Sequence, residues 1–110
     1  MLALLLVLSL TDPGFSCAAT GTKLLVPATT PDAACTRLRA GLARAGVRPD
    51  GVRVALRFEK PGIASARVIR VAGGRATELP EISVATSDKA MGPSTIDLLA
   101  REIAGRLAKR

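Results

Sequence analysis

Histidine, tryptophan and tyrosine are absent from this 110-residue sequence, and phenylalanine occurs only as Phe15 and Phe58. Without histidine, the chain lacks the usual general base near neutral pH, the Ser-His and Cys-His nucleophile pairs and the commonest metal ligand. With so few aromatic rings, the core has to be built from Val, Leu, Ile and Ala, and base stacking has almost no side chains to use. We therefore predict no catalytic residue, no metal site and no cofactor.

Acidic side chains are also scarce. Nine Asp and Glu stand against sixteen Lys and Arg, which gives a formal net charge of +7. The excess lies between residues 36 and 75, which hold ten basic and two acidic side chains. Twelve of the sixteen cations are Arg, the side chain better suited to bidentate contacts with phosphate or carboxylate. A solvated surface is the simpler interpretation of this composition, and an anion-binding patch is the more specific one.

The chain begins with an apolar run, residues 2–10, interrupted only by Ser9. This run has the length of the h-region of a secretory signal peptide and about half the length of a membrane span. Pro13 and Gly14 would end a helix, and the small residues that follow predict cleavage after Ala18, although no Lys or Arg precedes the run. We expect residues 1–18 to be a signal peptide and the mature chain to be periplasmic or secreted. A buried N-terminal strand or helix is the alternative.

Three fates of Cys17 are open. Cleavage after Ala18 would remove it and leave Cys35, the other cysteine, as a lone buried thiol. Earlier cleavage would retain Cys17 and allow a Cys17–Cys35 disulfide, worth roughly 3 kcal/mol. The third fate is lipidation, because a Cys shortly after the apolar run resembles the layout of a bacterial lipoprotein signal. However, Gly14 and Phe15 stand where that signal has Leu and a small residue. A lipid-anchored form is therefore the least favoured of the three.

Residues 31–45 carry the signals of a helix. Thr30 can cap it, Pro31 suits its first position and Gly46 suits the position after its end. The helix would bury one stripe of side chains, Cys35, Leu38, Leu42 and Ala45.

Three strands are predicted to follow this helix. Residues 52–59 alternate strictly between apolar side chains and mostly polar or charged ones, which is typical of a half-buried strand. The second strand is predicted at residues 64–71 and the third at residues 79–86. Gly73 and Gly74, between them, are expected to form a hairpin turn. A proline near the start of the third strand favours an edge position.

A second helix is predicted near the C-terminus. Ser94 and Asp97 have the spacing of a capping box in which Asp replaces Glu. Asp97 and Arg101 are spaced for an ion pair within the helix. The buried stripe would consist of Ile96, Leu99, Ile103 and Leu107.

Together these elements predict an α+β domain in the order α-β-β-β-α, with a three-stranded antiparallel meander and both helices packed on one face. The domain would span residues 31–110. Residues 19–30, with a short apolar piece at 24–26, would be a leader or a brief edge strand.

Charge and location supply the functional expectation. We expect a small exported binding or accessory module that uses an arginine-rich surface on an anionic envelope component or an acidic protein, with no transmembrane span in the mature chain. The alternative is a structural subunit that docks in an envelope complex through a β edge or a helix face. The arginine-rich surface would consist of Arg37, Arg44, Arg48, Arg53 and Arg57.

Two other functions are disfavoured by the residues. Double-stranded-RNA-binding domains have a similar order of elements, but they place a cluster of Lys at the start of the second helix, where this chain has the acid Asp97 and no base. Nucleic acid is therefore an unfavoured partner. Ser87 and Lys89 lie two residues apart in a loop, a spacing better explained by a solvated loop than by an activated nucleophile.

Overall fold

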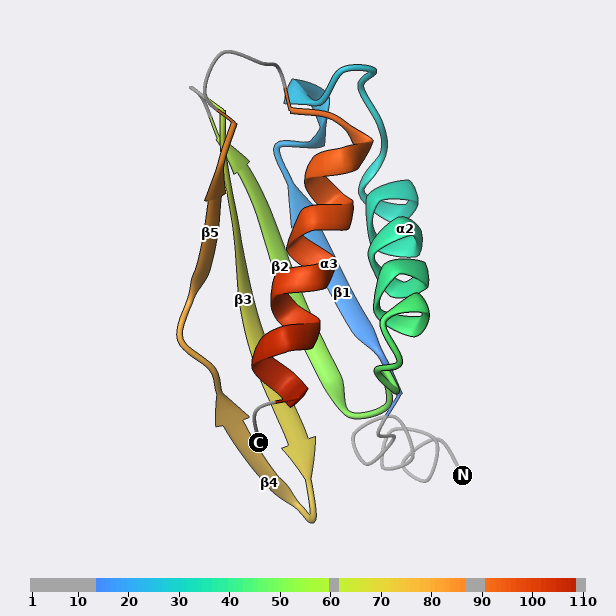
Figure 1. Cartoon of the computed structure of the whole chain (residues 1–110), viewed down its shortest axis with the longest axis vertical. Helices are drawn as coiled ribbons and strands as arrows, with labels where there is room; N and C mark the ends of the chain where they lie inside the picture. Colours follow the sequence, from blue (N-terminus) through green and yellow to red (C-terminus); the bar gives the residue numbers. More distant parts are fainter. Residues whose placement is uncertain (1–13, 60–61, 87–90, 109–110) are drawn as a thin grey trace, which may run out of the picture.

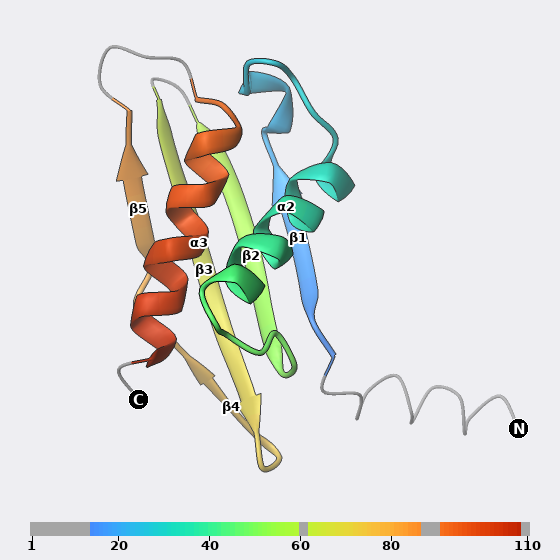
Figure 2. The ribbon, with the colours of Figure 1, turned by 45° about the vertical axis from the view of Figure 1, so that its right-hand side comes forward.

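The computed structural model describes residues 14–59, 62–86 and 91–108, which form a mixed five-stranded sheet with two helices on one face (Figures 1 and 2). The α+β class is therefore confirmed. The elements in chain order are β1 (Ser16–Thr20), the 3-10 helix η1 (Thr22–Leu24), α2 (Pro31–Arg44), β2 (Val52–Glu59), β3 (Ile63–Ala72), β4 (Arg75–Glu78), β5 (Ile82–Ala85) and α3 (Pro93–Ala108).

The sheet differs from the expected meander at its first strand. Ser16–Thr20 pairs in parallel with β2, and β2, β3 and β4 then follow in antiparallel order. The additional strand comes from residues that carry no strong alternation of apolar and polar side chains, and its pairing with β2 across more than thirty intervening residues is a tertiary contact. Of the two alternatives for residues 19–30, a leader or a brief edge strand, the strand does not form at residues 24–26, because Thr22–Leu24 forms η1.

The predicted third strand, residues 79–86, is present only as β5, Ile82–Ala85. A further strand that was not predicted, β4, precedes it, and both β4 and β5 pair with β3. β4 pairs Glu78 with Ile69, whereas β5 pairs Ile82 with Ala66, so three residues on the edge face two on β3. This is a one-residue β-bulge, and it contains Pro80, which has no N–H for the ladder. The bulge changes the alternation, so that Leu79 and Ile82 are both buried although they lie three residues apart.

Both turn glycines of the β3–β4 hairpin have positive φ, 59° at Gly73 and 76° at Gly74. Two consecutive residues in this region make the type I′ turn whose twist matches that of the paired strands. The predicted hairpin turn is therefore confirmed, and the hairpin extends beyond the C-terminal end of α3 (Figure 1).

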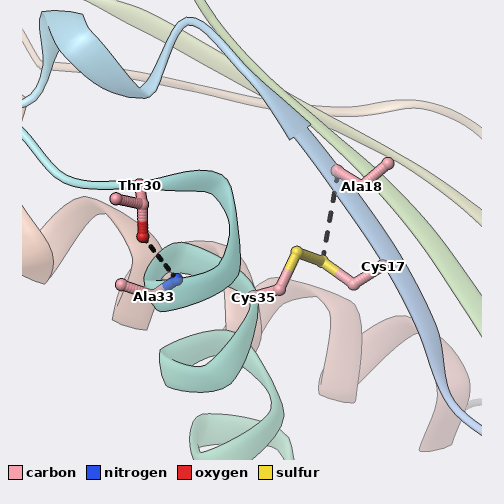
Figure 3. Close-up of a disulfide and its surroundings, with 5 residues drawn as sticks. All are labelled: Cys17, Ala18, Thr30, Ala33 and Cys35. Carbon is pink, nitrogen blue, oxygen red and sulfur yellow. Dashed lines mark hydrogen bonds between the residues drawn. A yellow bond between two sulfur atoms is a disulfide. The ribbon is translucent and has the colours of Figure 1, made fainter.

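The first predicted helix is confirmed as α2. The N–H of Ala33 donates to Thr30 Oγ1 at 3.1 Å (Figure 3), and Gly46 follows the helix with φ of 83°. The cap of α3 differs from the prediction. The N–H of Gly92 donates to Thr95 Oγ1 at 3.0 Å, so the capping side chain is Thr95 and not the predicted Ser94 with Asp97.

The core lies between the sheet and the two helices. α2 packs over β1 and α3 over β3 and β5, and the helices run in the same direction (Figures 1 and 2). The largest fully buried side chains are all aliphatic, as the scarcity of aromatic residues predicts: Leu38, Leu42, Leu56, Ile82, Leu99, Ile103, Val52 and Val68. Ala45, predicted to be buried, is exposed, and Ala34 is buried in α2 instead.

A disulfide joins Cys17 in β1 to Cys35 in the first turns of α2, with the two Cα atoms 5.8 Å apart (Figure 3). Of the three fates considered for Cys17, the structure therefore shows the bridge, and Cys35 is not a free thiol. Residues 1–13 of the predicted signal segment lie outside the described residues, whereas residues 16–18 belong to β1. Within residues 14–59, 62–86 and 91–108, no helix is long and apolar enough to cross a membrane.

Candidate functional site

The five arginines predicted to share one surface lie on different faces of the molecule. Arg37 and Arg44 belong to α2, in the helical layer, and Arg48 lies in the loop between α2 and β2. Arg53 and Arg57 alternate with the buried residues of β2, so they lie on the open face of the sheet, away from both helices. The structure therefore does not bring the five arginines together on one surface, because α2 covers one face of the sheet and Arg53 and Arg57 lie on the other.

Three arginines of the helical layer surround Asp97, a residue of α3. Arg37 makes a bidentate contact with it, Nε to Oδ1 at 2.9 Å and Nη2 to Oδ2 at 2.8 Å. Arg44 Nη2 lies 3.8 Å from Oδ1. The hydrogen bond from Arg37 holds the pKa of Asp97 below its usual value, and the positive charges of Arg37, Arg44 and Arg101 act in the same direction against the partial burial of the carboxyl. Asp97 therefore stays ionised at neutral pH.

A shallow groove between the helices adjoins this ion pair. Its volume is about 380 Å³, and its lining residues are Gly41, Arg44, Ala45, Asp97 and Arg101. The helices approach so closely here that a Cβ on Gly41 would lie 2.7 Å from the Cβ of Ala100. Since Arg37 already satisfies Asp97 in a bidentate contact, the guanidinium groups of Arg44 and Arg101 leave a net positive charge at the groove. We call Arg37, Arg44, Asp97 and Arg101 the interhelical arginine cluster.

A pocket of about 230 Å³ lies on the other side of the Arg37–Asp97 pair, near the N-terminal ends of both helices, and polar and apolar atoms line it in nearly equal measure. Arg37 is the one charged residue of its lining, which is otherwise mostly Ala, Pro, Leu and Ile. The space between α2 and α3 therefore presents a pocket of mixed polarity and a cationic groove in succession, separated by one ion pair.

The arginines on the open face of the sheet are mostly paired. Arg57 forms an ion pair with Glu59 on the same strand, and Arg67 donates to Glu78 Oε2 from Nη2 at 2.7 Å. Hydrogen bonding to Glu78 raises the pKa of Arg67 further above its usual value. Among the described residues, Arg53 makes no such contact. Of these three arginines, only Arg53 is therefore unpaired.

Another basic hollow, of about 410 Å³, lies beside the β3–β4 hairpin between Arg70 and Arg75. Arg70 Nη1 donates there to the carbonyl oxygen of Leu107, near the C-terminal end of α3, at 3.4 Å. Such carbonyls carry partial negative charge and are often satisfied by a cationic side chain. Arg70 therefore has a structural role at the end of the helix.

Sequence reasoning missed two members of the interhelical arginine cluster. Asp97 was expected to pair with Arg101 within α3, but its hydrogen-bonding partner is Arg37, which is 60 residues away in the chain. Spacing within one helix indicates only local pairs, so no sequence signal pointed to this contact. Ser87 and Lys89 lie outside the described residues.

The described part of the chain contains no group of three or more Cys, Asp or Glu side chains placed to hold a metal ion. No protein-family model matches the sequence, and no curated protein is similar enough to match it.

Proposed function

We propose that this protein is a small exported binding module that uses the interhelical arginine cluster to hold an anionic group of an envelope component. The observation that carries the proposal is the pair Arg44 and Arg101, which flank a groove whose only acid, Asp97, is already held by Arg37. Guanidinium groups suit phosphate and carboxylate because their donors form a planar fork.

The aliphatic side chains in the adjoining pocket, such as Leu25 and Ile96, support a ligand in which the charge lies next to an acyl chain. Apolar lining residues favour burial of hydrocarbon, and the arginines favour an anionic headgroup over a zwitterionic one. Among anionic envelope components, anionic lipids have this combination, whereas soluble polyanions have charge alone.

The disulfide supports an exported location. Disulfides persist in oxidising compartments such as the periplasm and the extracellular space, and they are rare in the cytosol. β1 consists of Ser16–Thr20, and Cys17 within it forms the disulfide, so the folded chain has to retain these residues. We therefore place the end of any signal segment before Ser16 and not after Ala18. Intact mass of the exported protein, with and without reductant, tests both points, and a mature chain that begins at Ala19 would contradict them.

Binding to vesicles tests the proposed ligand. The purified protein should bind phosphatidylglycerol vesicles and not phosphatidylcholine vesicles, with an affinity that falls as salt rises. Retention on a soluble polyanion such as heparin separates a lipid preference from attraction to any polyanion. Absence of salt-dependent binding to the anionic vesicles would rule out the proposed function.

Two charge-reversal variants locate the surface. The first variant combines Arg44→Glu with Arg101→Glu, and the second combines Arg53→Glu with Arg57→Glu. Both change the net charge by the same amount, but on opposite faces of the sheet. The first variant should lose at least tenfold in vesicle affinity, and the second should keep most of it. Equal losses in both variants would show that net charge alone matters. The milder Arg44→Gln with Arg101→Gln variant provides the same comparison if the first variant unfolds.

A further inference from the structure

The two edges of the sheet differ in how they are protected against pairing with another strand. One edge consists of β4 and β5, and it is interrupted by the bulge that contains Pro80. The other edge is β1, and Ser16–Thr20 contains no proline, no charged residue and no bulge. Proteins commonly blunt exposed edges with such features because an unprotected edge accepts a further strand. β1 lacks them and is the outermost strand of its side of the sheet (Figures 1 and 2).

The β1 edge is also held in place before any partner binds. All five residues of β1 pair with β2, from Ser16 opposite Arg53 to Thr20 opposite Arg57. The Cys17–Cys35 disulfide fastens the strand to α2 (Figure 3). A preformed edge lowers the entropy cost of binding, because only the partner has to become ordered.

The surroundings of this edge are basic on both sides. On the open face, Arg53 and Arg57 stand one strand inward, behind the small side chains of Ser16 and Thr20 in the same rows. Arg53 is unpaired among the described residues, whereas Arg57 has Glu59 of the same strand as its partner. A strand added beside β1 would lie about 10 Å from β2, two inter-strand spacings. Because the intervening side chains are small, an arginine of β2 and an acidic side chain of the added strand can meet across β1.

On the helical side, Arg39 of α2 lies over the ring of Phe15, with its guanidinium carbon 5.9 Å from the ring centroid. Phe15 directly precedes β1, so this cation stands beside the start of the edge. Arg39 and Arg53 therefore flank the same end of β1 from the two faces of the sheet. Two copies of the chain joined through β1 would bring these cations together, which disfavours self-pairing.

We propose that the outer edge of β1 accepts an extended segment of a partner protein as an additional strand, and that this segment carries acidic side chains at alternate positions. Main-chain hydrogen bonds to β1 supply affinity. Pairing of the acidic side chains with the unpaired Arg53, and with Arg57 in competition with Glu59, supplies specificity. This interaction lies on a different part of the molecule from the interhelical arginine cluster and does not depend on the proposed lipid binding.

Synthetic peptides test the proposal. An eight-residue peptide that alternates Glu with Val should bind the full chain at least tenfold more tightly than one that alternates Lys with Val. A peptide with the same composition as the first, but with its four Glu in one block, should bind no better than the Lys peptide. Equal binding of the alternating and the block peptide would overturn the proposal, because charge alone would then explain the interaction.

Hydrogen exchange locates the binding edge. The acidic peptide should slow amide exchange in β1 and leave β4 and β5 unchanged. Protection at β4 or β5 would overturn the assignment to β1. A finding that the protein is already a dimer joined through β1 would also overturn the proposal, since a second copy of the chain would then occupy the edge.

Charge reversal tests the role of the β2 arginines without requiring loss of the fold. Arg53→Glu with Arg57→Glu should reverse the preference, so that the Lys peptide binds more tightly than the Glu peptide. Arg44→Glu with Arg101→Glu, the variant expected to lose vesicle binding, should leave the peptide preference unchanged. An unchanged preference in the β2 variant would exclude Arg53 and Arg57 from recognition. Failure of one surface is therefore distinguishable from failure of the other.

Discussion

Cys17 and Cys35 connect the edge strand of the sheet to the helix that covers it, through a disulfide between residues 18 positions apart in the chain. β1 has only five residues and pairs with a single strand, so it depends on this covalent link more than the inner strands do. The link also holds in place the edge to which we assign partner binding.

Removal of the disulfide should destabilise the protein. Cys17→Ser with Cys35→Ser should lower the free energy of unfolding by about 3 kcal/mol, because the unfolded chain regains the conformational entropy of a closed loop. Urea denaturation of the variant, and of the wild type with and without reductant, measures the effect. Identical midpoints in all three samples would show that β1 does not need the bridge.

Close packing of the helices should make Gly41 intolerant of a side chain. A Cβ at Gly41 would lie 2.7 Å from that of Ala100, so Gly41→Ala should separate α2 from α3 and lower the free energy of unfolding by roughly 1–3 kcal/mol. Gly41→Ala combined with Ala100→Gly should recover part of this loss. Thermal or urea denaturation measures each variant.

Gly105 provides the matched control for this substitution. It lies in α3, and a Cβ there would meet no atom within 4 Å. Gly105→Ala should therefore raise the free energy of unfolding by roughly 0.5–1 kcal/mol, since Ala is the better helix former. If both glycine variants changed stability in the same direction, the contact with Ala100 would not be the cause.

The two turn positions of the β3–β4 hairpin should accept only residues that tolerate positive φ. Gly74 has φ of 76°, so Gly74→Val should destabilise the hairpin by roughly 1–2 kcal/mol. Gly73→Asn should be tolerated, because Asn followed by Gly is a preferred pair in type I′ turns. Denaturation midpoints of the two variants test this, and a larger loss in the Asn variant would be inconsistent with the observed turn.

The Arg37–Asp97 contact should make stability depend on pH in the acid range. The pKa of Asp97 is lowered from its ordinary value of 3.8 by the hydrogen bond from Arg37, so the ionised form stabilises the folded state. This contribution is present above the unfolded pKa and is lost as pH falls through the lower folded pKa. The difference in urea midpoint between wild type and Asp97→Asn should therefore be larger at pH 6 than at pH 3.

The Asp97→Asn comparison removes the contribution of the other carboxyl groups, because they titrate in both proteins. A difference that stays constant between pH 6 and pH 3 would mean that the charge of Asp97 has no part in stability. Arg37→Gln should show the same convergence at low pH, since it removes the other partner of the contact.

Most individual elements could be predicted from the sequence because their signals are local. α2 is marked by Thr30 and Gly46, β2 by strict alternation, and the hairpin by Gly73 and Gly74, and each of these signals acts within a few residues. The strand after the hairpin was predicted only in part, because the bulge at Pro80 changes which side chains face the core.

Local patterns in the chain are therefore sufficient to predict the α+β class, both helices, β2, most of β3 and an aliphatic core, since periodicity and capping are properties of short segments. Four other features depend on the folded arrangement: the presence of β1, the contact of Cys17 with Cys35, the pairing of Asp97 with Arg37 and the division of the arginines between two faces. These relationships join residues far apart in the chain, and packing of the helices against one side of the sheet brings them together or keeps them apart.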